Sequence, residues 1–290
     1  MCIQVSKHTN PRGKTMKKVL LATSALFLTA GVASAEITFS GTAGAGVVST
    51  ADMDTRVWSG IDINLAASAT TDGGVTVSIA DDIGGGELID WDDDYAIDAQ
   101  GGAISGTPAV TVKSGALTVV FNNNDIDHLD SDATKGDIHI NTTMGGLTLD
   151  VVADIDQSSG TDMSYKLGYS AGDLTVGYSA QDDSSKLSAS YKVGDMSVGV
   201  SSDDNGAGVT TNEASVSYTA GNVTLKGAAD DQDGWDLDVS YSVGAISVAY
   251  GTDESEEWDL NASYDLGGGV AAKASLTSGD FMAAGLTFSF

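Results

Sequence analysis

The chain has 290 residues, of which 13 are basic and 41 acidic, so its formal net charge is −28 at pH 7. A charge this negative argues against nucleic acid and anionic lipid surfaces as partners. One cysteine excludes an internal disulfide, and two prolines are few enough for a chain built almost entirely of paired strands.

The first 35 residues differ from the rest because they contain no acidic residue. Met16-Lys17-Lys18 begins a charged segment, residues 19–32 are mostly apolar, and Ala33-Ser34-Ala35 matches an A-x-A cleavage site. This arrangement is typical of a secretory signal peptide, and the apolar run is too short for a stable membrane span. We therefore predict an upstream extension plus a cleaved signal peptide over residues 1–35.

Residues 36–290 form the predicted mature chain, a single domain of 255 residues. It keeps eight basic and all 41 acidic residues, a formal net charge of −33, and no cysteine. No apolar run of 18 residues remains, so no helix is expected to span a membrane. The chain must hold together through its own hydrogen bonds and packing.

The first half of the mature chain reads as alternating strands. We expect strands over residues 37–48 and 56–70, a tight turn at residues 71–74, and a third strand from Val75. Residues 81–107, rich in glycine and aspartate, interrupt the alternation and are predicted to be a loop. Alternation then returns at Val110 and continues through turns near Gly115 and Gly145.

The second half repeats one unit of Tyr-x-x-Gly. Its five copies begin at residues 169, 191, 218, 241 and 264, and are spaced 22, 27, 23 and 23 residues apart. From Trp235 to Val243, apolar and polar residues alternate strictly, a period that a helix could not maintain. Each interval of about 23 residues is therefore one hairpin of two strands of about ten residues.

Aromatic residues recur at the ends of these strands. The tyrosines lie near the glycine turns and two tryptophans lie at the opposite strand ends, as two interfacial girdles of a membrane barrel would. The girdle residues are Tyr169, Tyr191, Tyr218, Tyr241, Tyr264, Trp235 and Trp258. The alternative reading, that they are aromatics of a soluble β core, fits the secretory leader less well.

Turn length supports an all-β fold, a transmembrane up-and-down antiparallel β-barrel. Short glycine turns at one rim and longer acidic loops at the other are the asymmetry of outer-membrane barrels. The best strand count is 18. It falls to 16 if one weak pair fails, and rises to 20 if residues 95–105 form their own hairpin.

The last strand carries a family likeness. Residues 263–269 (Ser-Tyr-Asp-Leu-Gly-Gly-Gly) and 285–290 (Gly-Leu-Thr-Phe-Ser-Phe) closely resemble the last hairpin of alphaproteobacterial general porins of the Rhodobacter type. The opening Glu36-Ile-Thr-Phe-Ser-Gly41 is similar to that family's first strand. The clear likeness covers about the last 30 residues plus these six. It implies that Phe290 is the signal read by the outer-membrane barrel assembly machinery.

The resemblance also implies a homotrimer of water-filled channels, each narrowed by an inward-folded loop whose acidic residues face basic residues on the wall. The acidic candidates are Glu87, Asp90, Asp92, Asp93, Asp94 and Asp98. The basic wall candidates are Arg56, Lys166, Lys186, Lys192 and Lys226. The sequence departs from the family pattern because this loop is shorter and follows the third strand instead of the fifth, and Arg56 is the only arginine of the mature chain.

Three readings of the acidic run in residues 81–107 stay open: a pore constriction, a Ca²⁺-bound loop at Asp92, Asp93 and Asp94, and a plain exposed loop. The candidate lumen carboxylates are Asp62, Asp150, Asp154, Asp236 and Asp238. The lumen lysines are equally well explained by wall salt bridges to Asp150, Asp236 or Asp238 as by transport. His128 and His139 are isolated and read as structural.

No catalytic constellation is present: the sequence has no His-Glu-x-x-His, and the mature chain has no cysteine. One Gly-x-Ser-x-Gly match, residues 168–172, lies at the first Tyr-x-x-Gly hairpin turn and not at the strand-to-helix turn that a nucleophile elbow requires. We predict a non-enzymatic general diffusion porin, weakly cation-selective, for small hydrophilic solutes. It would lie in a Gram-negative outer membrane among lipid and lipopolysaccharide, with no cofactor other than an open calcium option. The alternative is a secreted structural or adhesive Ca²⁺-binding β protein without a pore.

Overall fold

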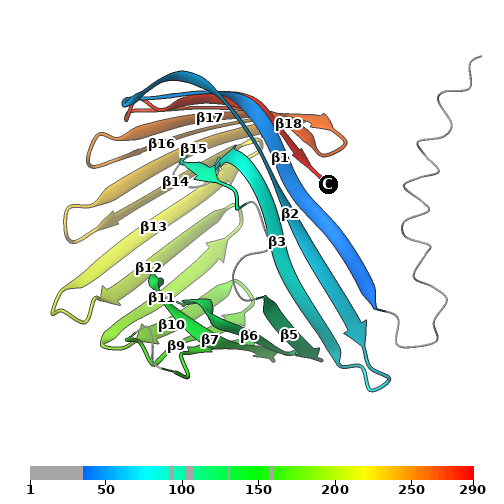
Figure 1. The fold of residues 1–290 in the computed structure, drawn as a ribbon. Coiled ribbons are helices and arrows are strands. Elements are labelled where there is room, and N and C mark those ends of the chain that lie inside the picture. Colours follow the sequence, from blue (N-terminus) through cyan, green and yellow to red (C-terminus); the bar gives the residue numbers. More distant parts are fainter. Residues whose placement is uncertain (1–34, 92–94, 102–107, 130, 157–159) are drawn as a thin grey trace, which may run out of the picture.

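The computed structural model describes residues 35–91, 95–101, 108–129, 131–156 and 160–290. In these ranges every regular element is a β-strand (Figure 1). The first ten strands are β1 (Glu36–Thr50), β2 (Met53–Thr70), β3 (Thr76–Ile89), β4 (Ile97–Ala99), β5 (Ala109–Ser114), β6 (Leu117–His128), β7 (Ser131–Met144), β8 (Leu147–Ala153), β9 (Met163–Ala171) and β10 (Leu174–Gln181). The remaining strands are β11 (Ser184–Val193), β12 (Met196–Asp204), β13 (Thr210–Ala220), β14 (Val223–Asp230), β15 (Trp235–Val243), β16 (Ile246–Asp253), β17 (Trp258–Gly267), β18 (Val270–Thr277) and β19 (Met282–Ser289).

The strands close into one antiparallel barrel. Each wall strand pairs with the next along the chain, and β19 pairs back with β1, which closes the ring. The short β4 pairs only with the end of β3, while β3 also pairs with β5, so β4 is not part of the wall. The wall therefore has 18 strands, which confirms the best count from the sequence. No helix in the described ranges has the length and hydropathy to cross a membrane.

Glycine turns define one rim of the barrel. Gly115, Gly145, Gly172, Gly194, Gly221 and Gly244 all have φ between 58° and 61°, a region that costs glycine little and suits tight hairpin turns. Several connections at the other rim are longer, as between β12 and β13 or between β16 and β17, whereas β1–β2 and β10–β11 are joined by short turns there. The predicted asymmetry of the two rims therefore holds in part.

The seam between β1 and β19 closes the barrel. The two strands pair from Thr42 opposite Ser289 to Ser49 opposite Met282. Gly41 and Phe290 exchange both backbone hydrogen bonds, at 3.0 and 3.1 Å. The indole of Trp58 on β2 lies over this seam, because a Cβ added at Gly44 or at Gly285 would lie 2.8 or 2.5 Å from its ring carbons. Small residues on β1 and β19 thus make room for one large aromatic.

The prediction of a loop over residues 81–107 is wrong for the first residues of that range. β3 does not end near residue 80 but continues to Ile89, paired with β2 up to Gly86 opposite Gly60. The alternation is lost there because Gly84, Gly85 and Gly86 carry no side chains to alternate, although their backbones still pair. Of residues 95–105, only Ile97–Ala99 forms a strand in the described part, so the predicted extra hairpin is absent there.

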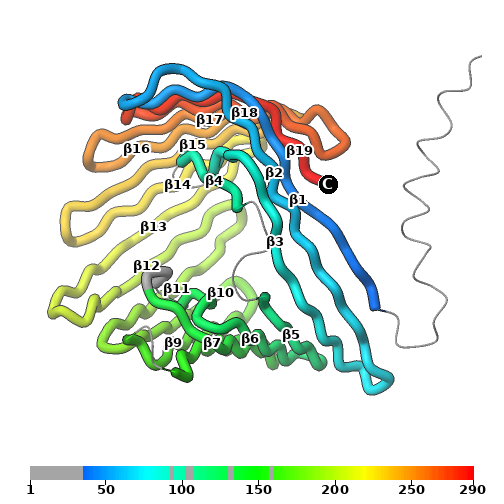
Figure 2. Tube along the Cα trace, viewed as in Figure 1, coloured from blue at the N-terminus to red at the C-terminus, as the bar shows by residue number. Residues whose placement is uncertain are grey.

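The path of the chain after β3 leads into the barrel. Figure 1 shows β4 within the ring of strands, and the tube in Figure 2 shows the same segment apart from the wall. The hydroxyl of Tyr95 donates to Asp259 on β17 at 3.2 Å. Asp259 and Asn261 therefore face inward, while their neighbours Trp258 and Leu260 face outward. Residues that are paired across neighbouring strands lie on the same face of the sheet. The register therefore identifies the inward and outward residues of every strand of the wall.

Candidate functional site

The chain enters the barrel where the end of β3 crosses the inner face of β2. Gly86 has φ of 78° and bends β3 at this point. A Cβ added at Gly60 on β2 would lie 2.4 Å from the carbonyl oxygen of Glu87, and one added at Gly86 would lie 2.2 Å from the carbonyl oxygen of Ser59. Only glycine at both positions allows the two backbones to lie this close. These two glycines therefore set where the chain leaves the wall. We call the described residues 87–91 and 95–101 the inner loop.

An apolar cluster holds the inner loop against the wall. Val48, Trp58 and Ala283, on the inner faces of β1, β2 and β19, are each 1% exposed, and Ile89 of the loop covers them at 5%. The partly buried residues packed around this cluster are Leu88, Trp91, Ile97 and Phe281. We call these eight residues the loop anchor. The loop is thus held largely by buried apolar side chains.

The inner loop then spans the barrel interior to the opposite wall. Trp91 packs edge to face on Trp58, with ring centroids 6.0 Å apart, and the Lys273 ammonium lies 5.9 Å from the centre of the Trp91 ring. Four residues on, Tyr95 bonds to Asp259 and also accepts a bond from the Asn261 amide. One short segment therefore contacts β1, β2 and β19 on one side and β17 and β18 on the other. The lumen is narrowed by this crossing.

The acidic residues predicted for the constriction have different surroundings. Glu87 forms an ion pair with Arg56, and the two side chains are 39% and 33% exposed. The Asp90 backbone N–H bonds to the Ala96 carbonyl at 3.0 Å, which joins the outgoing and returning arms of the inner loop, and Asp98 is exposed on β4. Asp92, Asp93 and Asp94 lie outside the described residues. Their calcium option and their place in the pore stay predictions.

The predicted basic residues are placed on the inner wall but are not gathered opposite the loop. Arg56 is the exception, through its pair with Glu87. Lys186 on β11 pairs with Asp203 on β12 at 3.4 Å. Among the described residues, no ion pair forms between Lys166, Lys192 or Lys226 and an acid. Asp150, one of the three acids predicted as salt-bridge partners of the lumen lysines, instead accepts hydrogen bonds from His139 at 3.1 Å and Asn141 at 2.7 Å.

Carboxylates converge on the wall facing the inner loop. Asp238 on β15 and Asp259 on β17 are both in register with Gly251 on β16. A Cβ added at Gly251 would lie 3.0 and 2.5 Å from oxygens of these two side chains, so both carboxylates lean over the glycine. Together with Asp236 and Tyr95 they line an open cleft of about 420 Å³. Asp62 lies on the inner face of β2, where its Oδ1 is buried.

A second inward fold is formed by the hairpin of β6 and β7. The two strands pair regularly up to Phe121 opposite Ile138, and the register then shifts. Beyond the shift His128 is 3% exposed, and its Nδ1 lies 2.9 Å from the hydroxyl of Ser164 on the inner face of β9. The hairpin tip thus covers the inner face of β8, where Val152 is 1% exposed. The structural roles expected for His128 and His139 agree with these contacts.

Acidic residues meet again behind this hairpin. Oxygens of Asp137, Asp154 and Asp156 lie within 4.8 Å of one another. Asp137 accepts from the backbone N–H groups of Asn124 at 2.9 Å and Ile155 at 2.8 Å, and Asp156 accepts from the Asn124 amide at 3.2 Å. The bend is therefore held by hydrogen bonds to carboxylates. Asp154, predicted to be a lumen carboxylate, is 4% exposed and belongs to this bend.

Sequence reasoning missed the second inward fold and Lys273. The signal for the fold was the run from Asn122 to Asp125, which interrupts the alternation of β6. Asn124 has φ of 53°, a conformation that asparagine tolerates better than most residues. Lys273 alternates with outward Ala272 and Ala274 on β18 and could have been included with the other wall lysines.

The predicted girdle residues all lie on the outer face. Tyr169, Tyr191, Tyr218, Tyr241 and Tyr264 are 43–49% exposed and lie near the glycine turns, while Trp235 and Trp258 begin β15 and β17 at the other rim. The same face carries Leu, Val and Ile in register with them. An apolar outer band and a polar interior with an inward loop form a channel, not an active site.

A family model for Gram-negative porins matches residues 22–283. The chain belongs to this family. Porins are non-enzymatic channel proteins of the outer membrane. Family membership therefore confirms two predictions from the sequence, that the protein is not an enzyme and that it lies in the outer membrane. The two alternatives, a soluble β core and a secreted Ca²⁺-binding β protein without a pore, do not fit a closed barrel of this family.

Solved porin structures share the fold. The barrel is similar to two engineered variants of the porin of Rhodopseudomonas blastica, a five-substitution mutant at 15% identity and a triple mutant at 16%. In both cases the TM-score is 0.55, and the match covers 88% of this chain and all of the other. A search of curated protein sequences found no match. The predicted likeness to the alphaproteobacterial general porins is confirmed at the level of family and fold.

Proposed function

We propose that this porin is a general diffusion channel that passes small hydrophilic solutes with weak preference for cations. The observation that supports it best is the distribution of charge around the inner loop. Asp236, Asp238 and Asp259 face the lumen beside the inner loop with no ion pair among the described residues. Arg56 is tied to Glu87, and the wall lysines Lys166, Lys192 and Lys226 are not gathered opposite the loop. Unpaired carboxylates raise the local concentration of cations.

The lumen carboxylates act through solvent, so salt controls their effect. The screening length is about 10 Å at 0.1 M salt and about 3 Å at 1 M. At 0.1 M the field of Asp238 and Asp259 extends across much of a narrowed channel, and at 1 M it does not. Cation preference should therefore decline as salt rises.

The test is the reversal potential of the purified protein in planar bilayers under a KCl gradient. At low salt we expect a reversal potential of the sign that shows K⁺ to permeate more easily than Cl⁻. Its magnitude should decrease toward zero at high salt. Replacing Asp92, Asp93 and Asp94 by Asn should lower the preference if these residues also face the pore. A reversal potential that favours Cl⁻ would overturn the proposed selectivity.

Export and assembly belong to the same proposal. Residues 1–35 would be removed as a signal peptide, and Phe290 would be the assembly signal. Its ring is on the outer face, 46% exposed, and stacks on Phe288 with centroids 5.6 Å apart. The mature barrel would form homotrimers in lipid and lipopolysaccharide. Deleting the Phe290 side chain should lower the yield of heat-modifiable barrel in the outer membrane without changing the amount exported.

A further inference from the structure

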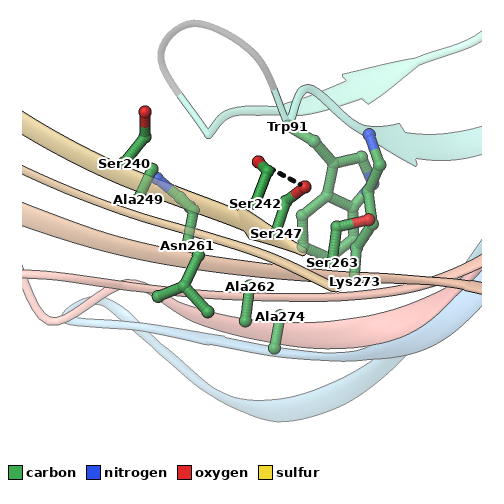
Figure 3. Close-up of a pocket in the computed structure, with 11 residues that line it drawn as sticks. Trp91, Ser240, Ser242, Ser247, Ala249, Asn261, Ala262, Ser263, Lys273 and Ala274 are labelled. Carbon is green, nitrogen blue, oxygen red and sulfur yellow. Dashed lines mark hydrogen bonds between the residues drawn. The ribbon is translucent and has the colours of Figure 1, made fainter. Parts of the chain in front are cut away.

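A small cavity lies between the inner loop and the wall formed by β15 to β18. Its volume is about 180 Å³. At about 30 Å³ for each water molecule, that is room for about six waters. Figure 3 shows Trp91 of the loop on one side and inward side chains of the wall, among them Ser240, Ser263 and Asn261, on the other. The cavity opens to the lumen, so a passing solute can enter it.

Trp91 gives the cavity an aromatic side. The loop anchor holds the indole in place through its edge-to-face contact with Trp58. An indole ring has a negative face that attracts positively polarised C–H and N–H groups. The Lys273 ammonium, 5.9 Å from the ring centre, is one such group. The C–H groups of an uncharged solute can also pack on the Trp91 indole, because this contact does not require a charge on the solute.

The wall gives the cavity hydroxyl and amide groups. Ser242 and Ser247, at the two ends of the β15–β16 turn, bond to each other at 3.0 Å and keep oxygen lone pairs available. Asn261 donates its amide N–H groups to Tyr95 and Asp259, whereas its Oδ1 is buried and has no hydrogen-bond partner among the described residues. A buried acceptor without a donor is costly. A ligand that donates hydrogen bonds would remove this cost.

We propose that this cavity is a binding subsite for neutral polyhydroxylated solutes, of the size of one sugar ring, that pass through the channel. The C–H face of the ring would pack on Trp91, and its hydroxyls would bond to the serines and to Asn261 Oδ1. An aromatic surface combined with a few well-placed polar groups is typical of small-molecule binding sites in proteins. This inference rests on the proposed channel function and adds solute retention to it.

The test is the current through single channels in the presence of glucose, with triethylene glycol as a solute of similar size that offers no ring of hydroxyls. We expect glucose to lower the current in a saturable way, beyond the linear decrease that triethylene glycol causes. The variant Ala249→Leu adds a larger side chain to the cavity from β16 on the wall side. It should abolish the saturable part.

Matched controls separate the subsite from general narrowing. Thr148→Leu adds a similar side chain to the inner face of β8, outside this cavity, and should keep saturable block by glucose. Trp91→Phe keeps an aromatic ring and should keep part of the block, while Trp91→Ala should raise the half-blocking concentration by about fivefold to tenfold.

Two results would overturn the inference. Glucose and triethylene glycol could lower the current equally and linearly, or Ala249→Leu could leave saturable block unchanged. Absence of any conductance would instead overturn the proposed function, and the subsite with it. A conducting channel without saturable block would overturn the subsite alone.

Discussion

The backbone of Glu87 lies on the inner face of Gly60, so close that a Cβ added at Gly60 would come within 2.4 Å of the Glu87 carbonyl oxygen. This contact marks where the chain stops being wall and becomes the inner loop. The loop then crosses from the β1–β2–β19 side to β17, where Tyr95 bonds to Asp259. The width of the channel therefore depends on how firmly the inner loop is held.

Gly60→Ala should displace the loop from the wall, because backbone atoms cannot yield to the added methyl group. We expect higher conductance and noisier single-channel currents in an otherwise normal barrel. Gly168→Ala is the matched control, since the added Cβ on the inner face of β9 would be 3.8 Å from Thr148. Unchanged conductance in Gly60→Ala would show that the inner loop does not limit the pore.

Ile89→Ala should loosen the inner loop without opening the barrel. Deleting a buried isoleucine side chain costs about 2–5 kcal/mol, and here the loss falls on the loop anchor. Hydrogen exchange of the backbone amides in β4 should become faster, while exchange in β10 to β14 stays slow. Val57→Ala, which removes methyl groups from an outward side chain next to Trp58, should leave β4 exchange unchanged. Equal exchange in both variants would contradict the anchor.

Arg56→Gln and Glu87→Gln should change ion selectivity in opposite directions. The first removes the only arginine of the mature chain and leaves a carboxylate beside the pore, so cation preference should rise; the second should lower it. Both side chains are about one third exposed, so we expect the stability change to be at most about 1 kcal/mol. The check is the reversal potential at low salt. No shift in either variant would place the pair outside the ion path.

Asp238→Asn together with Asp259→Asn should reduce cation preference more than either single change. Both carboxylates lean over Gly251 on the wall that faces the inner loop. The shift should be large at 0.1 M salt and small at 1 M because of screening. Asp231→Asn, outside the strands at the loop rim, is the control. Equal effects of the control and the double variant would mean that surface charge, not lumen charge, sets selectivity.

A pH effect is expected at the loop rim. The Asn212 side-chain amide, then the Asn212 backbone N–H, donate to Asp231 and lower the pKa of its carboxyl below the ordinary value of 3.8. Because the pKa is lower in the folded state, this link stabilises the loop fully above pH 3.8 and is lost as the pH falls through the lowered value. Titration of Asp231 by NMR should show the low pKa in the native protein and a less depressed pKa in Asn212→Ala, which loses the side-chain amide and keeps the backbone donor. Identical values would contradict the link.

The wall of the barrel was predictable because the sequence patterns that specify its strands each lie within a few neighbouring residues. A period of two, repeated Tyr-x-x-Gly units and glycine turns define strands, faces and rims without any knowledge of distant contacts. The 18 strands and the outward tyrosines follow from these patterns. Even the family resemblance rested on local motifs, the last hairpin and six residues at the start of the first strand.

The interior was less predictable because it depends on contacts between residues far apart in sequence. Nothing near Gly60 indicates that Glu87 will lie on it, and nothing near Trp58 indicates that it will pack on Ile89. The glycines at residues 84–86 hid the continuation of β3, since they carry no side chains to show the period. The wall lysines were placed on the correct face, but register alone does not decide their partners. Lys186 pairs with Asp203 opposite it, whereas Lys166 lies opposite Asp150 and forms no ion pair among the described residues. The Asp150 carboxylate instead accepts from His139 and Asn141.

The central claim is that the polar face of each strand lines a water-filled channel and the apolar face meets lipid. Residues 36–290 contain no cysteine, so single cysteines can be placed at the adjacent positions Val239 and Ser240 of β15. In reconstituted protein, a charged thiol reagent should react quickly with Ser240→Cys and reduce the single-channel current, and should not react with Val239→Cys. Rapid reaction at Val239→Cys with no reaction at Ser240→Cys would contradict the account.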